Sequence, residues 1–196
     1  MKFKILYLTF SLLLLAILSC KNTNSQQKIS EDEKKIYIKK GQEVINQTFA
    51  VLAGKLQGAM KEGGVPNAIN YCNLNAMPIV DSLSKAYDCT IRRTTLKARN
   101  PANIAKGEEA QILKEYEAAA LEGKALTPIV QHDQTKIVSF FAPIKVNAFC
   151  LQCHGKVGET LKETDYALIK KHYPNDAATG YTAGDLRGMW RVTFQN

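Results

Sequence analysis

The chain has 196 residues, and 26 lysines and arginines against 18 aspartates and glutamates give it a formal net charge of +8 at pH 7. No run of basic residues is interleaved with aromatic residues at the density typical of nucleic-acid binding. We therefore expect a solvated basic surface and no nucleic-acid partner. This length suits one ordinary domain with a sizeable hydrophobic core.

The N-terminal segment has the pattern of an export signal. Lys2 and Lys4 precede an almost purely apolar run at 5–18, and Ser19 and Cys20 follow at once. These are the charged region, the apolar region and the small-residue cleavage site of a secretory signal peptide, and the run is too short for a comfortable membrane span. The alternatives are an ordinary signal peptide with a coincidental cysteine and an uncleaved anchor helix.

The sequence ILSC at 17–20 resembles a bacterial lipobox. The resemblance implies a lipoprotein signal peptide at 1–19 and a diacylglycerol-bearing Cys20. Residues 20–30 are then a flexible tether after the lipid. Because a lysine follows Cys20, resemblance to Gram-negative lipoproteins implies sorting to the outer membrane. We expect a periplasmic, lipid-anchored protein whose residues 31–196 form a single domain.

A pair of helices is predicted at the start of this domain. Apolar residues recur at three- and four-residue steps between 31 and 61, which is the stripe of a long amphipathic helix. Gly63 and Gly64 end this helix. Pro66 suits the first turn of a second helix, whose apolar stripe runs over 69–87.

The rest of the chain alternates between the two-residue period of strands and the longer period of helices. We predict strands at 90–98, 126–131, 136–144 and 188–194, helices at 108–121 and 161–172, a turn at 100–103, a hairpin at 132–135 and a glycine-bearing loop at 173–184. Helices that lead into an antiparallel sheet indicate the α+β class and argue against an all-helical protein.

The most specific feature of the sequence is the pentad CLQCH at 150–154. A CxxCH sequence is typical of c-type haem attachment, because its two thiols add across the porphyrin vinyl groups and the adjacent histidine lies beneath the iron. We expect one covalent haem c, attached through Cys150 and Cys153, with His154 as the first axial ligand. The motif is predicted to lie on a loop.

Two other interpretations of these cysteines are weaker. A redox disulfide of the thioredoxin type belongs next to a βαβ pattern, and the flanking sequences offer none. A zinc site needs two further Cys or His ligands at a second close spacing. The remaining candidates, which are isolated in the sequence, are Cys72, Cys89, His132 and His172.

Cys72 is the candidate for the second axial ligand of the iron. It lies within the apolar stripe of its helix, whereas Met77 falls about 110° from the centre of that stripe. Pro78 cannot donate to the carbonyl of Leu74, so we expect a kink that could tilt the thiol toward the iron. The alternatives are that Cys72 is a buried small hydrophobe, or that it forms a disulfide with Cys89.

Several sequence blocks, in order, resemble the c-type haem domain with a PAS-like fold. They are Cys72 with its neighbours, 93–97, 99–103, 143–144, 150–155, 173–176, 180–181 and 184–185. That family occurs as a stand-alone cyanobacterial cytochrome-like protein and as the extracytoplasmic sensor of many bacterial histidine kinases and chemoreceptors. The resemblance covers roughly residues 35 to 195. It implies a PAS-like antiparallel sheet with flanking helices and one haem held by a cysteine and a histidine.

Basic residues at and beyond the strand at 90–98 could hold the haem propionates. Arg93 and Arg99 could pair with propionates as bidentate partners, or they could form an exposed charged edge of the strand. His132 lies in a polar hairpin and should be solvated. His172 has the position of a structural residue near the negative pole of a helix dipole.

A thiolate ligand makes ferric haem neutral, and reduction then adds a negative charge in a low-dielectric pocket, so the reduction potential should be low. We expect a redox or gas sensor that signals through an unknown redox or signalling partner, because no transmembrane helix, kinase or methyl-accepting segment follows Asn196. The alternative is a periplasmic electron-transfer cytochrome with no signalling role. No base-nucleophile pair or second cofactor site suggests an enzyme.

Overall fold

The computed structural model describes residues 29–133 and 135–195. The predicted signal peptide, Cys20 and most of the predicted tether lie outside the described residues. Four strands form one antiparallel sheet in the order β1-β4-β3-β2. The strands are β1 (Cys89–Thr94), β2 (Ile129–His132), β3 (Val138–Lys145) and β4 (Leu186–Phe194). The last strand of the chain therefore lies inside the sheet, next to the first.

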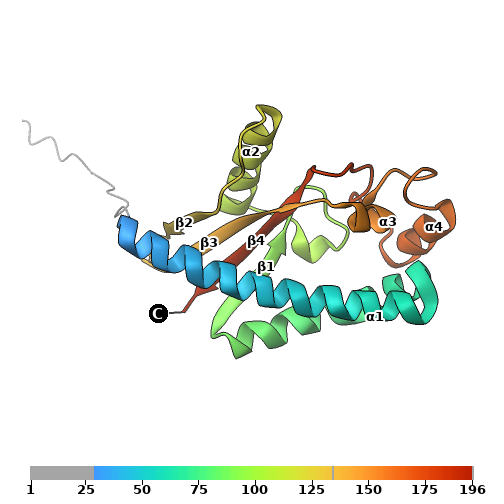
Figure 1. Ribbon diagram of the computed structural model, residues 1–196, viewed down its shortest axis with the longest axis horizontal. Coiled ribbons are helices and arrows are strands. Elements are labelled where there is room, and N and C mark those ends of the chain that lie inside the picture. Colours follow the sequence, from blue (N-terminus) through green and yellow to red (C-terminus); the bar gives the residue numbers. More distant parts are fainter. Residues whose placement is uncertain (1–28, 134, 196) are drawn as a thin grey trace, which may run out of the picture.

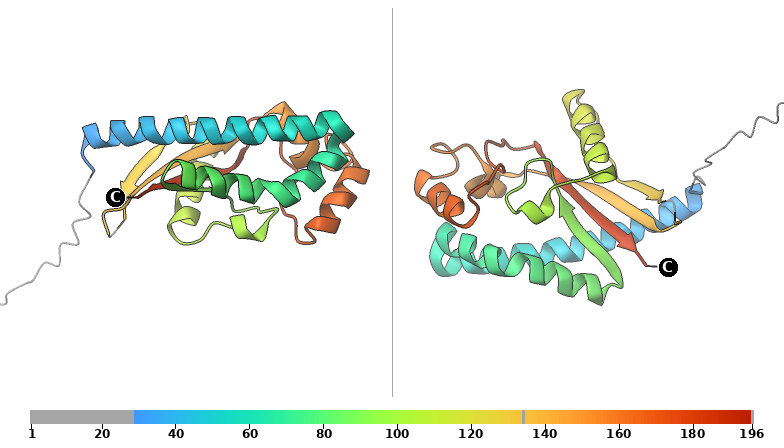
Figure 2. Two further views of the ribbon diagram at one scale, coloured as in Figure 1. Left: turned by 90° about the horizontal axis from the view of Figure 1, so that it is seen from below. Right: turned by 180° about the vertical axis from the view of Figure 1, so that it is seen from behind.

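A long helical hairpin, α1 (Glu31–Ala86), lies along one face of the sheet (Figure 1). The side-chain oxygen of Ser30 caps its start by accepting a hydrogen bond from the N–H of Glu33 at 3.2 Å. Gly63 and Gly64 have non-helical backbone angles, and the φ of 69° at Gly64 favours glycine. The chain reverses there into a first arm and a second arm, which run antiparallel (Figure 2). The predicted break at the glycine pair is confirmed.

The helix is not interrupted at Pro78, and the kink expected there stays a prediction. The non-helical angles within α1 lie at Gly63 and Gly64, and the helix continues through Pro78 to Ala86. Leu74, whose carbonyl loses its donor at Pro78, has a side chain that is 70% exposed. Water can bond a carbonyl on this exposed side, so the helix need not open.

The sheet carries a hydrophobic core on each face. The core on the α1 side includes Val44, Ile45, Val80, Ile91, Phe140, Trp190 and Val192. The core on the other side lies under α2 (Glu108–Leu121) and includes Ile112, Leu113, Tyr116, Phe141 and Met189. Gly41 lets the first arm pass directly over the ring of Phe140, because a Cβ at this position would overlap that ring. Adjacent residues of one strand, such as Met189 and Trp190, thus face opposite cores.

Two short helices lie at one end of the molecule. α3 (Leu151–His154) and α4 (Glu163–His172) lie near the turn between the arms of α1, and the start of α1 and the end of β4 lie at the opposite end (Figure 1). Leu161 and Ile169 pack against Ile69 of the second arm. The end that carries α3 therefore brings the CxxCH motif close to the second arm.

The antiparallel sheet with helices on its flanks is the α+β, PAS-like fold that the sequence predicts. α2 has the predicted bounds, and each predicted strand is present with shifted ends. Among the helices of the described residues, none combines the length and the apolar character that crossing a membrane requires.

Candidate functional site

The CxxCH pentad lies on a short helical segment. A 3-10 turn at 148–150 leads directly into α3, which spans Leu151–His154. The Oδ1 of Asn147 accepts hydrogen bonds from the backbone N–H and from the thiol of Cys150, each at 3.2 Å. The prediction of a loop is therefore wrong, because Asn147 caps the start of a helical turn.

His154 has one ring nitrogen engaged and leaves the other for a ligand. Its Nδ1 lies 2.7 Å from the backbone carbonyl oxygen of Ala178. Since a carbonyl only accepts hydrogen bonds, Nδ1 carries the proton and donates. Burial, followed by the positive charge of Arg99, holds the pKa of His154 well below its usual value. The imidazole is therefore neutral, and its Nε2 keeps a lone pair that is available to a metal ion.

Gly155, directly after the motif, has no room for a side chain. A Cβ at this position would lie 2.6 Å from the carbonyl oxygen of Leu151 and would overlap the side chain of Thr160. The carbonyl oxygen of Gly155 also accepts a hydrogen bond from the N–H of Gly180 at 2.9 Å. The backbone after the motif is thus packed tightly between two other segments.

Arg99 joins the motif to a distant loop. Its Nε and Nη2 donate to the two carboxylate oxygens of Asp176 at 3.2 and 3.1 Å, and Nη2 also donates to the carbonyl oxygen of Cys153 at 2.6 Å. The Asp176 side chain is fully buried. Asp176 in turn accepts from the N–H of Ala178, the residue that holds His154. Arg99 was predicted as a propionate partner, but its Nε and Nη2 already donate hydrogen bonds to other groups of the protein.

Cys72 lies on the second arm of α1 and is half-buried. Burial raises the pKa of its thiol, and the positive charges of Arg93 and Arg99 oppose that rise. Burial also raises the pKa of Cys153 to about 11, with Arg99 lowering it and Cys72 adding to it. These mutual effects mean that the two thiols and the two arginines share one electrostatic neighbourhood. The fold therefore brings Cys72 within electrostatic range of Cys153, across a long stretch of sequence.

Two half-buried arginines flank this neighbourhood. Arg93 lies on β1 with its guanidinium 5.7 Å from the centre of the Trp190 ring. Arg187 lies on β4 and 5.4 Å from the centre of the Tyr181 ring. Burial is the largest cause that lowers the pKa of both guanidinium groups. The site is therefore strongly positive.

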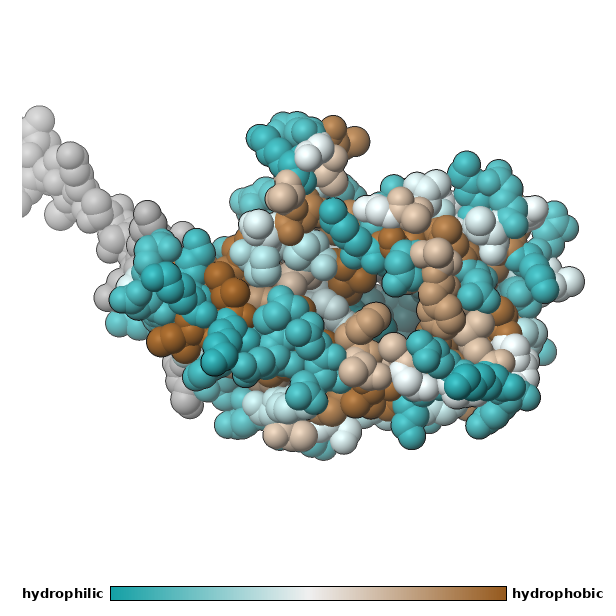
Figure 3. All heavy atoms as spheres, in the orientation of Figure 1, coloured by the Kyte–Doolittle hydropathy of each residue, from teal (hydrophilic) through white to brown (hydrophobic). Residues whose placement is uncertain are grey.

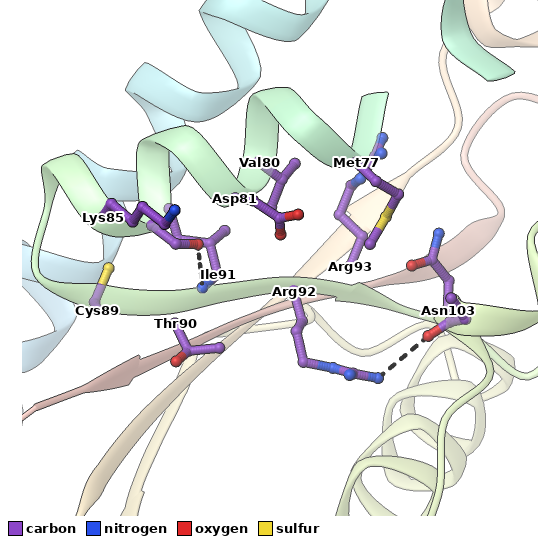
Figure 4. A pocket seen from close by; sticks show the side chains of 12 residues that line it. Met77, Val80, Asp81, Lys85, Cys89, Thr90, Ile91, Arg92, Arg93 and Asn103 are labelled. Carbon is purple, nitrogen blue, oxygen red and sulfur yellow. Dashed lines mark hydrogen bonds between the residues drawn. The ribbon is translucent and has the colours of Figure 1, made fainter. Parts of the chain in front are cut away.

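A cavity of about 500 Å³ lies between the second arm of α1 and β1 (Figure 4). Met77, Cys89 and Arg93 line it, together with polar residues of both elements, and the CxxCH residues do not. Figure 3 shows a recess on the face of the molecule between α1 and the end that carries α3. The chemistry of the CxxCH motif thus lies beyond the cavity, toward the turn of α1.

The chain is similar to known proteins over most of its length. The family model described as Tll0287-like matches residues 16–195. The chain belongs to the Tll0287-like family. It is also similar to the crystal structure of the cyanobacterial haem protein Tll0287, with 23% identity, a TM-score of 0.57 and coverage of 86% of this chain and 98% of that chain. A search of curated proteins found no match.

Membership of the Tll0287-like family confirms the resemblance stated from the sequence, and the structural likeness confirms the fold. Sequence reasoning missed Arg187 and Ala178, and it included Asp176 only as part of a family block. Asp176 is 77 residues from its partner Arg99 in the chain. A carbonyl that binds a histidine leaves no signal in residue type, so only the fold could show Ala178.

Other residues that were weighed as ligands lie elsewhere. His132 pairs through Nε2 with Glu33 at 3.1 Å, and its side chain is only 18% exposed, so the prediction of a solvated histidine is wrong. His172 bonds through Nε2 to Asn70 at 2.7 Å.

The disulfide between Cys72 and Cys89 that was weighed from the sequence is not formed, and both cysteines are free. Cys72 precedes the end of α1 at Ala86 by a stretch of helix that spans roughly 20 Å. Cys89 follows that helix end by a few residues. A disulfide joins Cα atoms at most about 7 Å apart, so these two cysteines cannot be bridged in this fold.

Proposed function

We propose that this member of the Tll0287-like family binds one covalent haem c and acts as a redox or gas sensor. The family and the likeness to a solved haem protein support haem binding. The observation that carries the proposal is the hydrogen bond from His154 Nδ1 to the carbonyl of Ala178, beside the two motif thiols. This bond selects the tautomer whose Nε2 can bind iron, and such outer partners are typical of metal-bound histidines.

The residues of the site fit a c-type haem. Cys150 and Cys153 would form the thioether bonds, and His154 would be an axial ligand. When bound, the haem supplies an iron that exchanges one electron and can bind a diatomic gas at an open position. The chain's own contribution is to orient the ligand: Ala178 fixes the imidazole, and Arg99 fixes the Cys153 carbonyl.

Cys72 is proposed as the second axial ligand. Its support is its place beside the motif thiol Cys153 and the positive charges of Arg93 and Arg99, which favour the thiolate form against burial. Arg93, buried on the same side, is proposed as a partner of a haem propionate. Arg99 would add a hydrogen bond to a propionate only through Nη1, because its other donors are engaged.

A thiolate ligand favours sensing over simple electron transfer. The anionic sulfur stabilises the ferric state, so the potential should be low and the haem should respond only to strongly reducing conditions. Loss of the thiolate on reduction would open a position for a gas. The runner-up function is a periplasmic electron carrier, which would keep both ligands in both states. We propose no enzymatic role.

The cellular setting follows from the N-terminal segment. Export as a lipoprotein through Cys20, with residence at the outer membrane, would place the domain in the oxidising periplasm where c-type haem is attached. A redox or signalling protein would then receive its signal. The unpaired positive charge around the motif is compatible with an acidic partner surface.

The first experiment tests covalent haem binding. The double variant Cys150→Ser, Cys153→Ser should lose all haem that survives on a denaturing gel, because both thioether bonds need a sulfur. Cys89→Ser is the matched control, since this buried cysteine lies away from the motif, and it should keep full pigment. Pigment that survives in the double variant would overturn the haem c assignment.

The second experiment separates sensor from carrier. Absorption spectra of the matured protein should be recorded in both oxidation states, with and without nitric oxide or carbon monoxide. A sensor should bind the gas readily in the ferrous state. A closed, reversible couple that ignores both gases would favour the carrier instead.

A further inference from the structure

Arg187 has a buried nitrogen that the described part of the chain does not satisfy. Its Nη1 donates to the Oγ1 of Thr95 at 3.0 Å and to the carbonyl oxygen of Lys97 at 3.1 Å. Its Nε is buried and has no hydrogen-bond partner among residues 29–133 and 135–195. Buried donors are nearly always bonded, so this nitrogen indicates an acceptor that the polypeptide does not provide.

Arg187 also lacks a carboxylate partner at ion-pair distance within the described residues, although Tyr181 and the more distant Asp176 favour its charged form. Arg92, Arg99 and Arg191 each pair with a carboxylate within 4 Å. Within the described residues, Arg187 and Arg93 form no such pair, although both side chains are half-buried and burial lowers the pKa of both guanidinium groups. Buried charges are almost always paired, so two unmatched cations in one neighbourhood indicate a missing anion.

Both unmatched arginines lie beside the proposed axial ligand. The centre of the Tyr181 ring lies 5.4 Å from the Arg187 guanidinium and 6.5 Å from the centre of the His154 ring, and the two rings are perpendicular. The charges of Arg187 and Arg93 both act on His154. Arg93 lies on β1 and Arg187 on β4, and these two strands pair with each other. An anion bound there would lie next to the ligand histidine.

We propose that Arg187 is a carboxylate-binding residue of the cofactor site, where its buried Nε donates to one haem propionate while Arg93 pairs with the other. This inference rests on the proposed function, because the carboxylates are those of the proposed haem. Arg99 differs from both residues, since the protein already supplies its anion in Asp176. The sequence suggested Arg93 and Arg99 as propionate partners, and Arg187 takes the place of Arg99 in this proposal.

The test is the reduction potential of the haem-loaded full chain, wild type and Arg187→Gln, measured from about pH 5 to about pH 8. Without the guanidinium, the pKa of a buried propionate rises into this range. At the acid end a bound proton replaces the lost positive charge, so the two potentials should coincide. At the alkaline end the propionate stays charged and the variant should have the lower potential, with its reduction equilibrium constant reduced on the order of tenfold.

The difference between the two proteins is the decisive quantity, because other groups near the site also titrate. The titratable and charged groups that face Arg187 are Tyr181, Asp176, Arg99, Arg93, Lys97 and His154. They are present in both proteins, so their own titration largely cancels. A general electrostatic or packing role of Arg187 would give one constant difference at every pH, and that result would overturn the proposal.

Arg92→Gln is the matched control. It removes the same charge from the neighbouring strand β1, but Arg92 is exposed and pairs with Glu109 at 3.3 Å. Its potential should differ little from the wild type, and by the same amount at each pH. A pH-dependent difference as large as that of Arg187→Gln would also contradict a specific carboxylate contact.

Arg187→Lys keeps the test usable if the glutamine variant does not fold. Lysine keeps the charge and loses the Nε donor, so we expect a smaller difference that still grows with pH. Covalent pigment separates this inference from the proposed function. Pigmented variants with a constant difference reject Arg187 alone, whereas a wild-type protein without pigment rejects the haem itself.

Discussion

Arg99 and Asp176 form a two-point ion pair that lies directly behind the CxxCH motif, because the same guanidinium donates to the carbonyl oxygen of Cys153 at 2.6 Å. Asp176 also accepts from the N–H of Ala178, whose carbonyl holds His154. One buried carboxylate therefore links both residues that orient the motif. Its loss should affect stability and the position of the histidine together.

We predict that Asp176→Asn lowers the free energy of unfolding by about 3 kcal/mol, because it leaves the mostly buried charge of Arg99 without an anion. Urea unfolding of the purified protein measures this change. Glu122→Gln is the control, since the pair between Glu122 and Lys124 is exposed and should contribute less than about 1 kcal/mol. Equal losses in both variants would contradict the role assigned to the buried pair.

Cys72→Ser should raise the reduction potential by on the order of 0.1 V or more, because the ferric state loses its anionic ligand. The ferric spectrum should lose its thiolate character, and added imidazole or cyanide should bind more readily. Spectroelectrochemical titration measures both effects. Cys89→Ser removes another buried thiol and should change neither. If the Cys72 variant also keeps the wild-type potential and spectrum, the second ligand is another residue.

Gly155→Ala should destabilise the protein by about 1–3 kcal/mol and reduce haem loading, because the new methyl group would press on the Leu151 carbonyl and on Thr160. Thermal unfolding and the ratio of haem to protein absorbance report the two effects. Gly54→Ala is the opposite case: no atom lies within 4 Å of a Cβ there, and the residue is helical. That substitution should stabilise by about 0.5–1 kcal/mol. A stabilised or fully loaded Gly155 variant would show that the motif is packed less tightly.

Cys20→Ala should leave an unacylated protein, because the thiol is the proposed site of lipid attachment. Metabolic labelling with a radioactive or clickable fatty acid, followed by membrane fractionation, measures the loss. Cys89→Ser again serves as the control and should remain labelled. A labelled Cys20 variant would disprove the lipoprotein assignment without touching the haem proposal.

Local sequence signals predicted much of the fold. Gly107 and Gly123 flank α2, so its bounds at 108–121 are visible in the sequence. Gly63 and Gly64 broke the helical pattern, as expected for glycines. Pro78 does not end the helix, because a helix tolerates a proline where water can bond the freed carbonyl. Local sequence patterns therefore predicted where helices begin and end. They could not predict which backbone carbonyls are exposed to water.

The candidate site was predicted only in part for a related reason. Cys150, Cys153 and His154 stand together in the sequence and carry a known spacing. Their supports do not: Arg187 meets Thr95 across 92 residues, and Arg99 meets Asp176 across 77. Such pairs depend on strand order and on the return of β4 beside β1, which no local pattern specifies.

The hairpin of α1 separates the two poles of the molecule. Its first arm, from Glu31 to Gly63, is about 48 Å long at the rise of an α-helix. Tyr37 near its start packs against Phe194 with ring centres 5.0 Å apart, so the described residues begin and end at the pole remote from His154. A lipid on Cys20 would attach the protein through the pole that carries the start of α1. Electrons, gases or a partner protein would reach the other pole, near His154. Membrane attachment and partner binding would then use different surfaces. Substitutions at the pole that carries His154 could change partner binding without affecting membrane attachment.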